Sequence, residues 1–283
     1  RSTLFPYTTL FRSRTLLDYR VLNLASNTFN ENETSYYHKS IGGYHAAKLR
    51  RYQELIDAYI SPEMQKAYSA IAQAQGDMTK VAGDTIYPVL NMLNTKYLIL
   101  PLQGGQTVPV LNTYAFGNAW FVGDIKYVDN ANEELDGVGK INLRHQAVAD
   151  AKFKEVLGEA VPEDDMAIVK LTKYEPNELT YDISSTKGGI VVFSEIYYPG
   201  WTATVDGEPV TVGRVDYVLR AINVKAGKHK VVLTFKPKSS RDTETVAYIA
   251  FALLFIAIIV GVWFEERKKR KAATTDNEKA SID

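Results

Sequence analysis

The segment at residues 36–51 combines glycine, tyrosine and basic residues in a pattern that suits a bound phosphate or sugar. Gly42 and Gly43 stand just before a helix predicted to begin at Ala46, and the backbone N–H groups of a helix N-terminus attract anions. Basic side chains would add positive charge, and tyrosine rings can stack on a sugar. The predicted ligand-binding residues of this segment are Tyr37, His38, Lys39, Gly42, Gly43, Tyr44, Lys48 and Arg51. A capped amphipathic helix with a solvated basic face would show the same pattern, and both interpretations stay open.

Two shorter motifs also offer side chains to a ligand. Pro199-Gly200 fits the centre of a type II turn, with Tyr198 and Trp201 on either side as platforms for a sugar ring. A tryptophan at such a position more often opens a strand and packs in the core, so that alternative stays open. Asn94 and Lys96 stand between a predicted helix and a predicted strand, where they could line a cleft. Helix capping and core packing would explain these two residues equally well.

The acidic residues do not form a recognisable catalytic pair. Glu133-Glu134 and Asp164-Asp165 are adjacent in sequence, so the two side chains of each pair point apart on a helix or a strand. We expect both pairs to be solvated surface. The chain has no cysteine, and it contains no HExxH, Walker or GxGxxG pattern. We therefore predict no catalytic residue, no metal site and no cofactor in this chain.

The elements that would position these residues are of mixed type in the first half of the chain. Strand patterns occur at residues 19–24, 96–100 and 120–128, and short helical patterns occur at 132–135 and 151–157. The helix from Ala46 should end at Ser61-Pro62, where a second helix begins that ends at Gly76. This mixture predicts an α/β or α+β domain.

From Ala167 onward the pattern changes to short runs of alternating, β-branched residues. There are seven such runs, and turn signals such as Asp206-Gly207 separate them. Strands of this length and spacing predict an antiparallel β-sandwich. The fold class is therefore α+β, with a mixed α/β domain followed by a β-sandwich and one C-terminal transmembrane helix.

Residues 246–264 carry no charge and, as a helix, would span about 28 Å, close to the thickness of a bilayer's hydrocarbon core. Residues 267–271 are five consecutive cations, which should stay in the cytoplasm and leave the preceding domains outside. The net charge of zero gives no sign of a nucleic-acid partner. We expect the lipid bilayer as a partner and a cytoplasmic membrane as the location.

Residues 1–13, RSTLFPYTTLFRS, match the translation of a common sequencing adapter and are interpreted as an artefact. The chain is therefore expected to be the C-terminal part of a longer protein. The predicted organisation is residues 14–165 as the mixed α/β extracytoplasmic domain, 166–238 as the β-sandwich, 239–245 as a linker, 246–264 as the transmembrane helix and 265–283 as a basic cytoplasmic tail.

Several motifs together resemble the C-terminal end of the YfhO family of bacterial membrane proteins, in its Bacteroides-type form. They are YYPGW at residues 197–201, LRAINV at 219–224 and AGKHKVVLTFKP at 226–237, with SIGGYHAAKLRRYQELI and NMLNTKYLILP in the first half. The resemblance implies a polytopic parent with a GT-C-like glycosyltransferase organisation, whose catalytic acid lies in a membrane part that this sequence does not include. This fragment alone is then expected to be non-catalytic.

The resemblance leads us to expect the extracytoplasmic C-terminal region of a glycosyltransferase of the cell envelope. Its implied partners are a polyprenyl-phosphate sugar and a cell-envelope glycan acceptor. The alternative is a non-catalytic, membrane-anchored module that binds a glycan or an envelope protein. Further membrane spans upstream, with an acidic residue in the first outer loop, would favour the enzyme.

Overall fold

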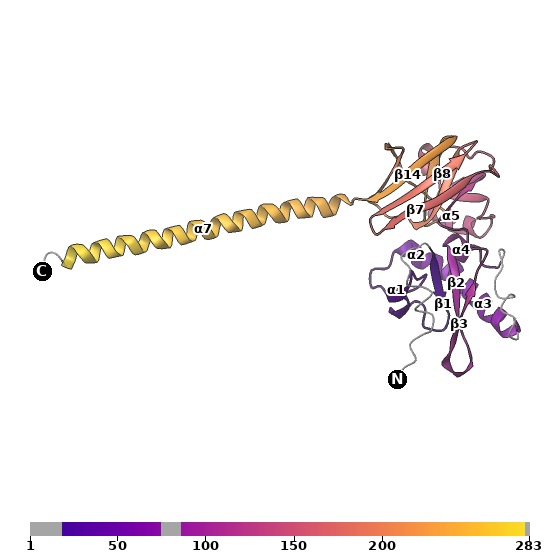
Figure 1. The fold of residues 1–283 in the computed structure, drawn as a ribbon, viewed down its shortest axis with the longest axis horizontal. Helices are drawn as coiled ribbons and strands as arrows, with labels where there is room; N and C mark the ends of the chain where they lie inside the picture. Colours follow the sequence, from indigo (N-terminus) through magenta and orange to yellow (C-terminus); the bar gives the residue numbers. More distant parts are fainter. Residues whose placement is uncertain (1–18, 75–85, 281–283) are drawn as a thin grey trace. The chain divides into compact units, whose positions relative to one another are not determined.

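The computed structural model describes residues 19–74 and 86–280, and the chain divides into two units, Arg1–Phe235 and Lys236–Asp283 (Figure 1). The first unit mixes helices with mostly antiparallel sheets. The second consists of one long helix that contains the apolar segment. The predicted α+β fold class with a C-terminal apolar helix is therefore confirmed.

The first unit begins with a three-stranded sheet in the order β1-β2-β3. Strand β1 is parallel to β2, and β3 is antiparallel to β2. Two parallel strands need a crossover connection, which is usually helical, and the chain between β1 and β2 contains such helices. The bounds are β1 (Arg20–Asn23), α1 (Glu33–Tyr37), α2 (Arg50–Leu55), α3 (Ser61–Ala74), α4 (Pro88–Met92), β2 (Thr95–Pro101), the 3₁₀ turn η5 (Gln103–Gly105) and β3 (Thr107–Leu111).

The helix after residue 46 differs from the prediction at both ends. Helix α2 begins at Arg50, not at Ala46, whereas the second helix, α3, begins at Ser61 as predicted, but without a break in the helical backbone before it. A π-helical turn, η3 (Ile56–Ile60), connects α2 to α3, and the Ser61 N–H donates to the Ile56 carbonyl. The longer hydrogen-bond step of a π turn lets the helix continue past a proline that has no N–H to donate. The predicted stop at Gly76 lies outside the described residues.

The predicted strand at residues 120–128 is two strands in different sheets. Strand β4 (Ala119–Val122) joins a four-stranded sheet, while β5 (Asp124–Val128) pairs in parallel with β6 (Gln146–Asp150). Helix α5 (Ala131–Val138) connects β5 to β6, and the Asn130 side chain caps it by accepting from the N–H groups of Asn132 and Glu133. The predicted helices at 132–135 and 151–157 are confirmed as α5 and as η6 (Ala151–Phe153) followed by α6 (Lys154–Leu157).

The later strands form the predicted antiparallel sandwich. Its sheets have the orders β11-β10-β14-β8-β7 and β12-β13-β9-β4. All seven predicted runs are strands, and β12 is an additional short strand that the sequence did not predict. The bounds are β7 (Ile168–Glu175), β8 (Glu178–Ser185), β9 (Gly189–Ile196), β10 (Trp201–Val205), β11 (Glu208–Val210), β12 (Gly213–Val215), β13 (Leu219–Val224) and β14 (Gly227–Phe235). The Asp206-Gly207 hairpin is confirmed, with positive φ at both residues.

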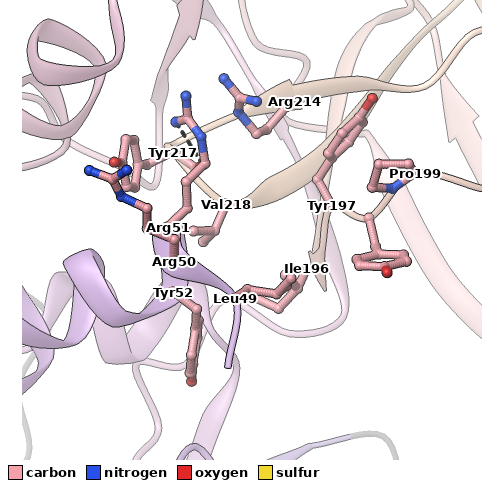
Figure 2. Close-up of a pocket in the computed structure, with 11 residues that line it drawn as sticks. Leu49, Arg50, Arg51, Tyr52, Ile196, Tyr197, Pro199, Arg214, Tyr217 and Val218 are labelled. Atoms are coloured by element: carbon pink, nitrogen blue, oxygen red, sulfur yellow. Dashed lines mark hydrogen bonds between the residues drawn. The ribbon is translucent and has the colours of Figure 1, made fainter. Parts of the chain in front are cut away.

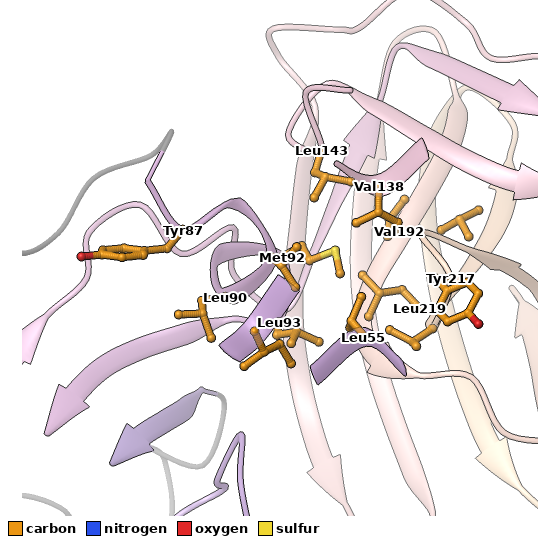
Figure 3. Close-up of a cluster of buried hydrophobic side chains, with 14 of the residues drawn as sticks. Leu55, Tyr87, Leu90, Met92, Leu93, Val138, Leu143, Val192, Tyr217 and Leu219 are labelled. Atoms are coloured by element: carbon orange, nitrogen blue, oxygen red, sulfur yellow. The ribbon is translucent and has the colours of Figure 1, made fainter. Parts of the chain in front are cut away.

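The four-stranded sheet is buried on both faces. Along β9, Val191 and Phe193 face the five-stranded sheet in one apolar cluster, while Ile190 and Val192 belong to a second cluster on the opposite face. This second cluster includes Leu55 and Met92 from the helices of the first half, which lie near Val192 in Figure 3. Strands covered on both sides read as continuous apolar runs, which explains the sequence IVVF at residues 190–193.

The predicted domain division between residues 165 and 166 stays a prediction. Strand β4, from before this division, pairs with β9, from after it. Residues on both sides of the division also contribute to the same apolar cluster. The two predicted parts therefore share a sheet and a core.

The second unit contains α7 (Lys238–Ala280), which begins directly after Pro237. Among the described residues, one helix segment, Val246–Lys269, is long and apolar enough to cross a membrane. The segment starts at the residue where the sequence predicted the span. The helix also includes residues 239–245, predicted as a linker, and most of the predicted tail.

A buried carboxylate fixes the start of α4 against α3. Glu63 on α3 is almost fully buried, and its two carboxylate oxygens accept from the N–H groups of Val89 and Leu90 at 2.9 Å each. These N–H groups are among those at a helix N-terminus that have no partner within the helix. Burial raises the pKa of the Glu63 carboxyl from 4.5 to about 7, against the opposing effect of the two hydrogen bonds.

This raised pKa predicts a pH-dependent stability. The folded protein holds a proton on Glu63 that the unfolded chain releases above pH 4.5, so stability is greatest below pH 4.5 and falls as the pH rises to about 7. The expected loss is about 3 kcal/mol, from about 1.4 kcal/mol per pKa unit. Glu63→Gln should remove this part of the pH dependence in urea unfolding of the detergent-solubilised chain. The exposed Glu155→Gln should keep it, and identical slopes for both variants would contradict the assignment.

Candidate functional site

A cavity of about 280 Å³ opens in the first unit where α2 meets the end of β9 and the β12–β13 hairpin (Figure 2). Its lining combines guanidinium groups, tyrosine rings and aliphatic side chains. The lining residues are Leu49, Arg50, Arg51, Tyr52, Ile196, Tyr197, Tyr198, Pro199, Arg214, Tyr217 and Val218. Two of the predicted binding residues, Arg51 and Tyr198, thus meet at one cavity although they are far apart in sequence.

One buried carboxylate organises the arginines of this cavity. Glu134 on α5 is fully buried, and its carboxylate lies 2.9 Å from a guanidinium nitrogen of Arg51 and 2.9 Å from one of Arg214. The expectation that Glu134 is solvated surface is wrong. The side chains of adjacent helix residues do point apart, so Glu133 faces solvent while Glu134 faces inward, and two cations compensate its buried charge.

Tyr217 links the same arginine to a second acid. The guanidinium of Arg51 lies 4.3 Å from the centre of the Tyr217 ring, and the Tyr217 hydroxyl donates to the carboxylate of Glu54. Burial and this hydrogen bond raise the pKa of Tyr217 to about 12, so its hydroxyl is a donor at neutral pH. Glu54 also accepts from Arg50 at 2.9 Å across an exposed helix face. All three arginines of the cavity therefore have carboxylate partners.

The loop that carries Tyr217 has an unusual backbone. Asp216 and Tyr217 both have positive φ, 48° and 70°, although neither is glycine and both are buried. Asp216 holds the loop in place, because its N–H donates to the Val148 carbonyl and its carboxyl accepts from the Val148 N–H. Burial raises the pKa of Asp216 to about 8. Strained, buried loops of this kind are common at functional sites.

The tyrosine wall of the cavity depends on the predicted Pro199-Gly200 turn. Gly200 has a φ of 106°, and the Trp201 N–H approaches the Tyr198 carbonyl at 3.4 Å, as the type II turn requires. The turn leaves Tyr198 half exposed at the cavity. Trp201 is not among the residues that line the cavity. It opens β10, with the Arg220 guanidinium 3.7 Å from its ring centre and Phe235 5.4 Å away.

The glycine pair at 42–43 does not lie at a helix N-terminus, so the geometric basis for a phosphate site there is wrong. The Gly42 N–H donates to the Ser40 hydroxyl at 3.0 Å, and the Gly43 N–H donates to the Thr28 carbonyl at 2.7 Å. A Cβ at Gly42 would lie 1.9 Å from the Thr28 carbonyl oxygen. Close backbone packing against Thr28 therefore explains why position 42 holds glycine.

The other predicted residues of that segment are dispersed. Tyr37 and Tyr44 are exposed, and burial lowers the pKa of the half-buried His38. Lys39 pairs with Glu195 at 3.3 Å, and Lys48 lies 5.2 Å from the centre of the Phe29 ring. None of these residues lines the cavity of Figure 2. Their part in binding, like that of Trp201, stays a prediction.

Asn94 and Lys96 line a second cavity, of about 330 Å³, as the sequence suggested for this pair. It lies beside β2 and the loop between β3 and β4. Arg50 of the first cavity is one of the basic residues in the segment at 36–51 that the sequence singled out. Arg214 and Tyr217 were missed, because nothing in the local sequence marks either residue.

The buried Glu134 pair gives a direct test of this site. Glu134→Ala would leave Arg214 buried without its carboxylate, and breaking a buried ion pair in this way costs about 3–5 kcal/mol. The exposed neighbour Glu133→Ala should cost less than about 1 kcal/mol. Chemical denaturation followed by tryptophan fluorescence measures both losses. Equally small losses would contradict a buried, structural role for Glu134.

The comparisons with known proteins fit this description. Residues 139–243 match the family model described as bacterial membrane protein YfhO. No curated protein matches the chain. The matched segment includes strands β7 to β14 and the tyrosine turn at residues 197–201, but not the apolar part of α7. The similarity of the chain to the YfhO family of bacterial membrane proteins therefore covers residues 139–243.

Proposed function

We propose that this chain is the extracytoplasmic C-terminal region of a polytopic membrane protein that transfers sugar from a polyprenyl phosphate to a glycan of the cell envelope. In this proposal, the cavity of Figure 2 holds one saccharide unit of the donor or the acceptor. The observation that supports it is the meeting of Tyr197, Tyr198 and the arginines at a single cavity.

The lining suits a sugar ring better than most other ligands. Tyrosine rings and aliphatic side chains offer apolar surface to the C–H faces of a sugar, while guanidinium groups donate hydrogen bonds to its hydroxyls. Arg51 and Arg214 share the Glu134 carboxylate, and Arg214 also lies 3.7 Å from the Asp150 carboxylate, so both guanidinium groups are held in place and their positive charge is largely balanced. The volume of about 280 Å³ is near the lower end for ligand pockets, which suits one monosaccharide unit.

The role of the cavity in this proposal is positioning. Glu54, Glu134 and Asp150 are acids in contact with its lining residues, and each is paired with an arginine, a lysine or Tyr217. None of them is therefore assigned as a general acid or base. Because these acids are already paired, the cavity suits the alternative function equally well, a membrane-anchored module that binds an envelope glycan without transferring it.

The first prediction concerns the membrane topology. Residues 267–271 should remain in the cytoplasm, because clusters of lysine and arginine near a span resist translocation. A reporter active only in the cytoplasm should therefore give signal when fused after Asp283. The same reporter inserted at Gly104-Gly105, where an added Cβ would meet nothing within 4 Å, should be silent. The opposite pattern would reverse the orientation and exclude an envelope role for the first unit.

The second prediction concerns the half-exposed Tyr198. Removing one aromatic contact with a sugar should cost about 0.5–1.5 kcal/mol, or roughly two- to tenfold in affinity. Tyr198→Ala should lower both sugar transfer in membranes containing the parent protein and binding of labelled envelope glycan to this chain. The control is Tyr36→Ala, which removes a tyrosine that is 83% exposed and lines neither cavity.

The two readouts separate the alternatives. If the glycan binds the chain in a Tyr198-dependent way but the parent protein transfers no sugar, the binding module is supported and the enzyme is not. If Tyr198→Ala and Tyr36→Ala behave alike in both assays, the cavity of Figure 2 has no part in glycan recognition.

A further inference from the structure

The second cavity differs from the first in whether its basic side chains are paired with carboxylates. It is lined by Tyr19, Asn94, Lys96, Leu111, Asn112, Thr113, Ala115, Gly117 and Asn118, and it shares no lining residue with the first cavity. Whereas each arginine of the first cavity pairs with a carboxylate, no aspartate or glutamate among the residues that the structure describes lines the second. Within the described residues, Lys96 has no ion pair, and its ammonium lies 5.4 Å from the centre of the Tyr19 ring.

The positive charge of Lys96 is also partly shielded from water. The side chain is half-buried, and Tyr19 beside it is buried. Charges in such positions interact more strongly with a ligand than charges in open solvent do, because the local dielectric constant is lower. An anion that enters this cavity would therefore meet a cation that no carboxylate has neutralised.

The remaining walls are polar and held in place. The Asn112 amide donates to the Asn91 side chain at 2.7 Å and to the Thr95 carbonyl at 2.9 Å, and it accepts from the Tyr114 N–H at 3.1 Å. At the other side, the Asn118 carbonyl accepts from the Ser194 N–H at 2.9 Å. These bonds attach the loop between β3 and β4 to β2 and β9, so the cavity does not need to form when a ligand arrives.

Asn94 is fixed at the floor of this arrangement by its backbone. It has a φ of 57°, a left-handed conformation that asparagine tolerates better than most residues, and its carbonyl accepts from the Arg20 N–H at 2.8 Å. Asn94 and Lys96 both belong to the lining of this cavity.

We propose that this second cavity binds the anionic group of an acidic saccharide. The Lys96 ammonium is the counter-ion, and the amides of Asn94 and Asn118 with the Thr113 hydroxyl form hydrogen bonds to the sugar. A single cation among neutral hydrogen-bonding groups matches one negative charge on a polar ring, and the volume of about 330 Å³ admits a unit of that size. A carboxylate and a phosphate share this chemistry. The inference does not depend on the function proposed for the first cavity.

Calorimetric titration of the full chain in nanodiscs of neutral lipid tests this proposal with three probes: glucuronate, glucose 1-phosphate and glucose. At least one of the two anions should bind roughly tenfold more tightly than glucose, and which one binds identifies the group recognised. Raising the salt concentration should weaken that binding. Equal binding of glucose and both anions, or no saturable binding of either anion at about 1 mM, would overturn the proposal.

Matched variants assign the effect to Lys96. Lys96→Met should lower the affinity for the anion roughly tenfold or more, and Lys96→Arg, which keeps the charge, should retain most of it. Lys48→Met is the control, because Lys48 is also a half-buried lysine beside an aromatic ring but lines neither cavity. An equal loss in Lys48→Met would place the anion elsewhere and refute the assignment.

Discussion

The sheet formed by β12, β13, β9 and β4 is buried on both faces, and the architecture of the first unit depends on this. A sheet with one apolar face needs one partner layer, whereas a sheet with two needs a layer on each side. The five-stranded sheet covers one face, through Val191 and Phe193. The helices and short strands of the first half must cover the other, because Ile190 and Val192 would otherwise be exposed to water. Both cavities lie beside segments that adjoin this sheet.

A buried carboxylate, Glu134, and a partly buried one, Glu195, add specificity to this apolar contact. Glu134 pairs with Arg51 and Arg214, and Glu195 pairs with Arg20 at 3.0 Å and Lys39 at 3.3 Å. Burial alone would raise the pKa of Glu195, but the positive charges of Arg20 and Lys39 outweigh it and hold the pKa below its ordinary value. Apolar packing tolerates small shifts of one layer over another, whereas a buried charge must meet its partners at fixed positions. These ion pairs therefore fix the register between residues far apart in the chain.

Much of the fold could be predicted from the sequence, because local signals and the final structure agree there. Alternating β-branched runs, the Asp206-Gly207 hairpin and the Pro199-Gly200 turn all depend on interactions within a few residues. The apolar span in α7 is equally local. The continuation of the helix past Pro62 was missed, because a π turn has no sequence signature comparable to that of a proline break.

The candidate site was less predictable, because its key features are tertiary. Whether Glu134 is solvated or buried depends on the distant Arg214, and no pattern within α5 encodes that pairing. The local sequence around Tyr217 likewise gives no sign of positive φ, because the loop is held by contacts of Asp216 with Val148 on another strand. Arg51, Tyr198, Asn94 and Lys96 were predicted because polar and aromatic residues next to turns and helix ends are often presented at a surface, and all four line a cavity. The sequence could not group them into two cavities, since that depends on how the layers meet.

The charge state of each cavity follows from its place beside the doubly buried sheet. The first cavity adjoins α5, so its guanidinium groups lie within reach of the buried Glu134 and become part of the structure. The second adjoins the loop before β4, where backbone carbonyls and asparagine amides, not carboxylates, form the contacts between layers. Amides satisfy the hydrogen bonds of a loop without adding charge. In the part of the chain that the structure describes, Lys96 therefore keeps an uncompensated charge, whereas the arginines of the first cavity are paired with carboxylates. The same packing that balances the charge of the first cavity therefore leaves the second electropositive. The ligands of the two cavities should accordingly differ mainly in charge.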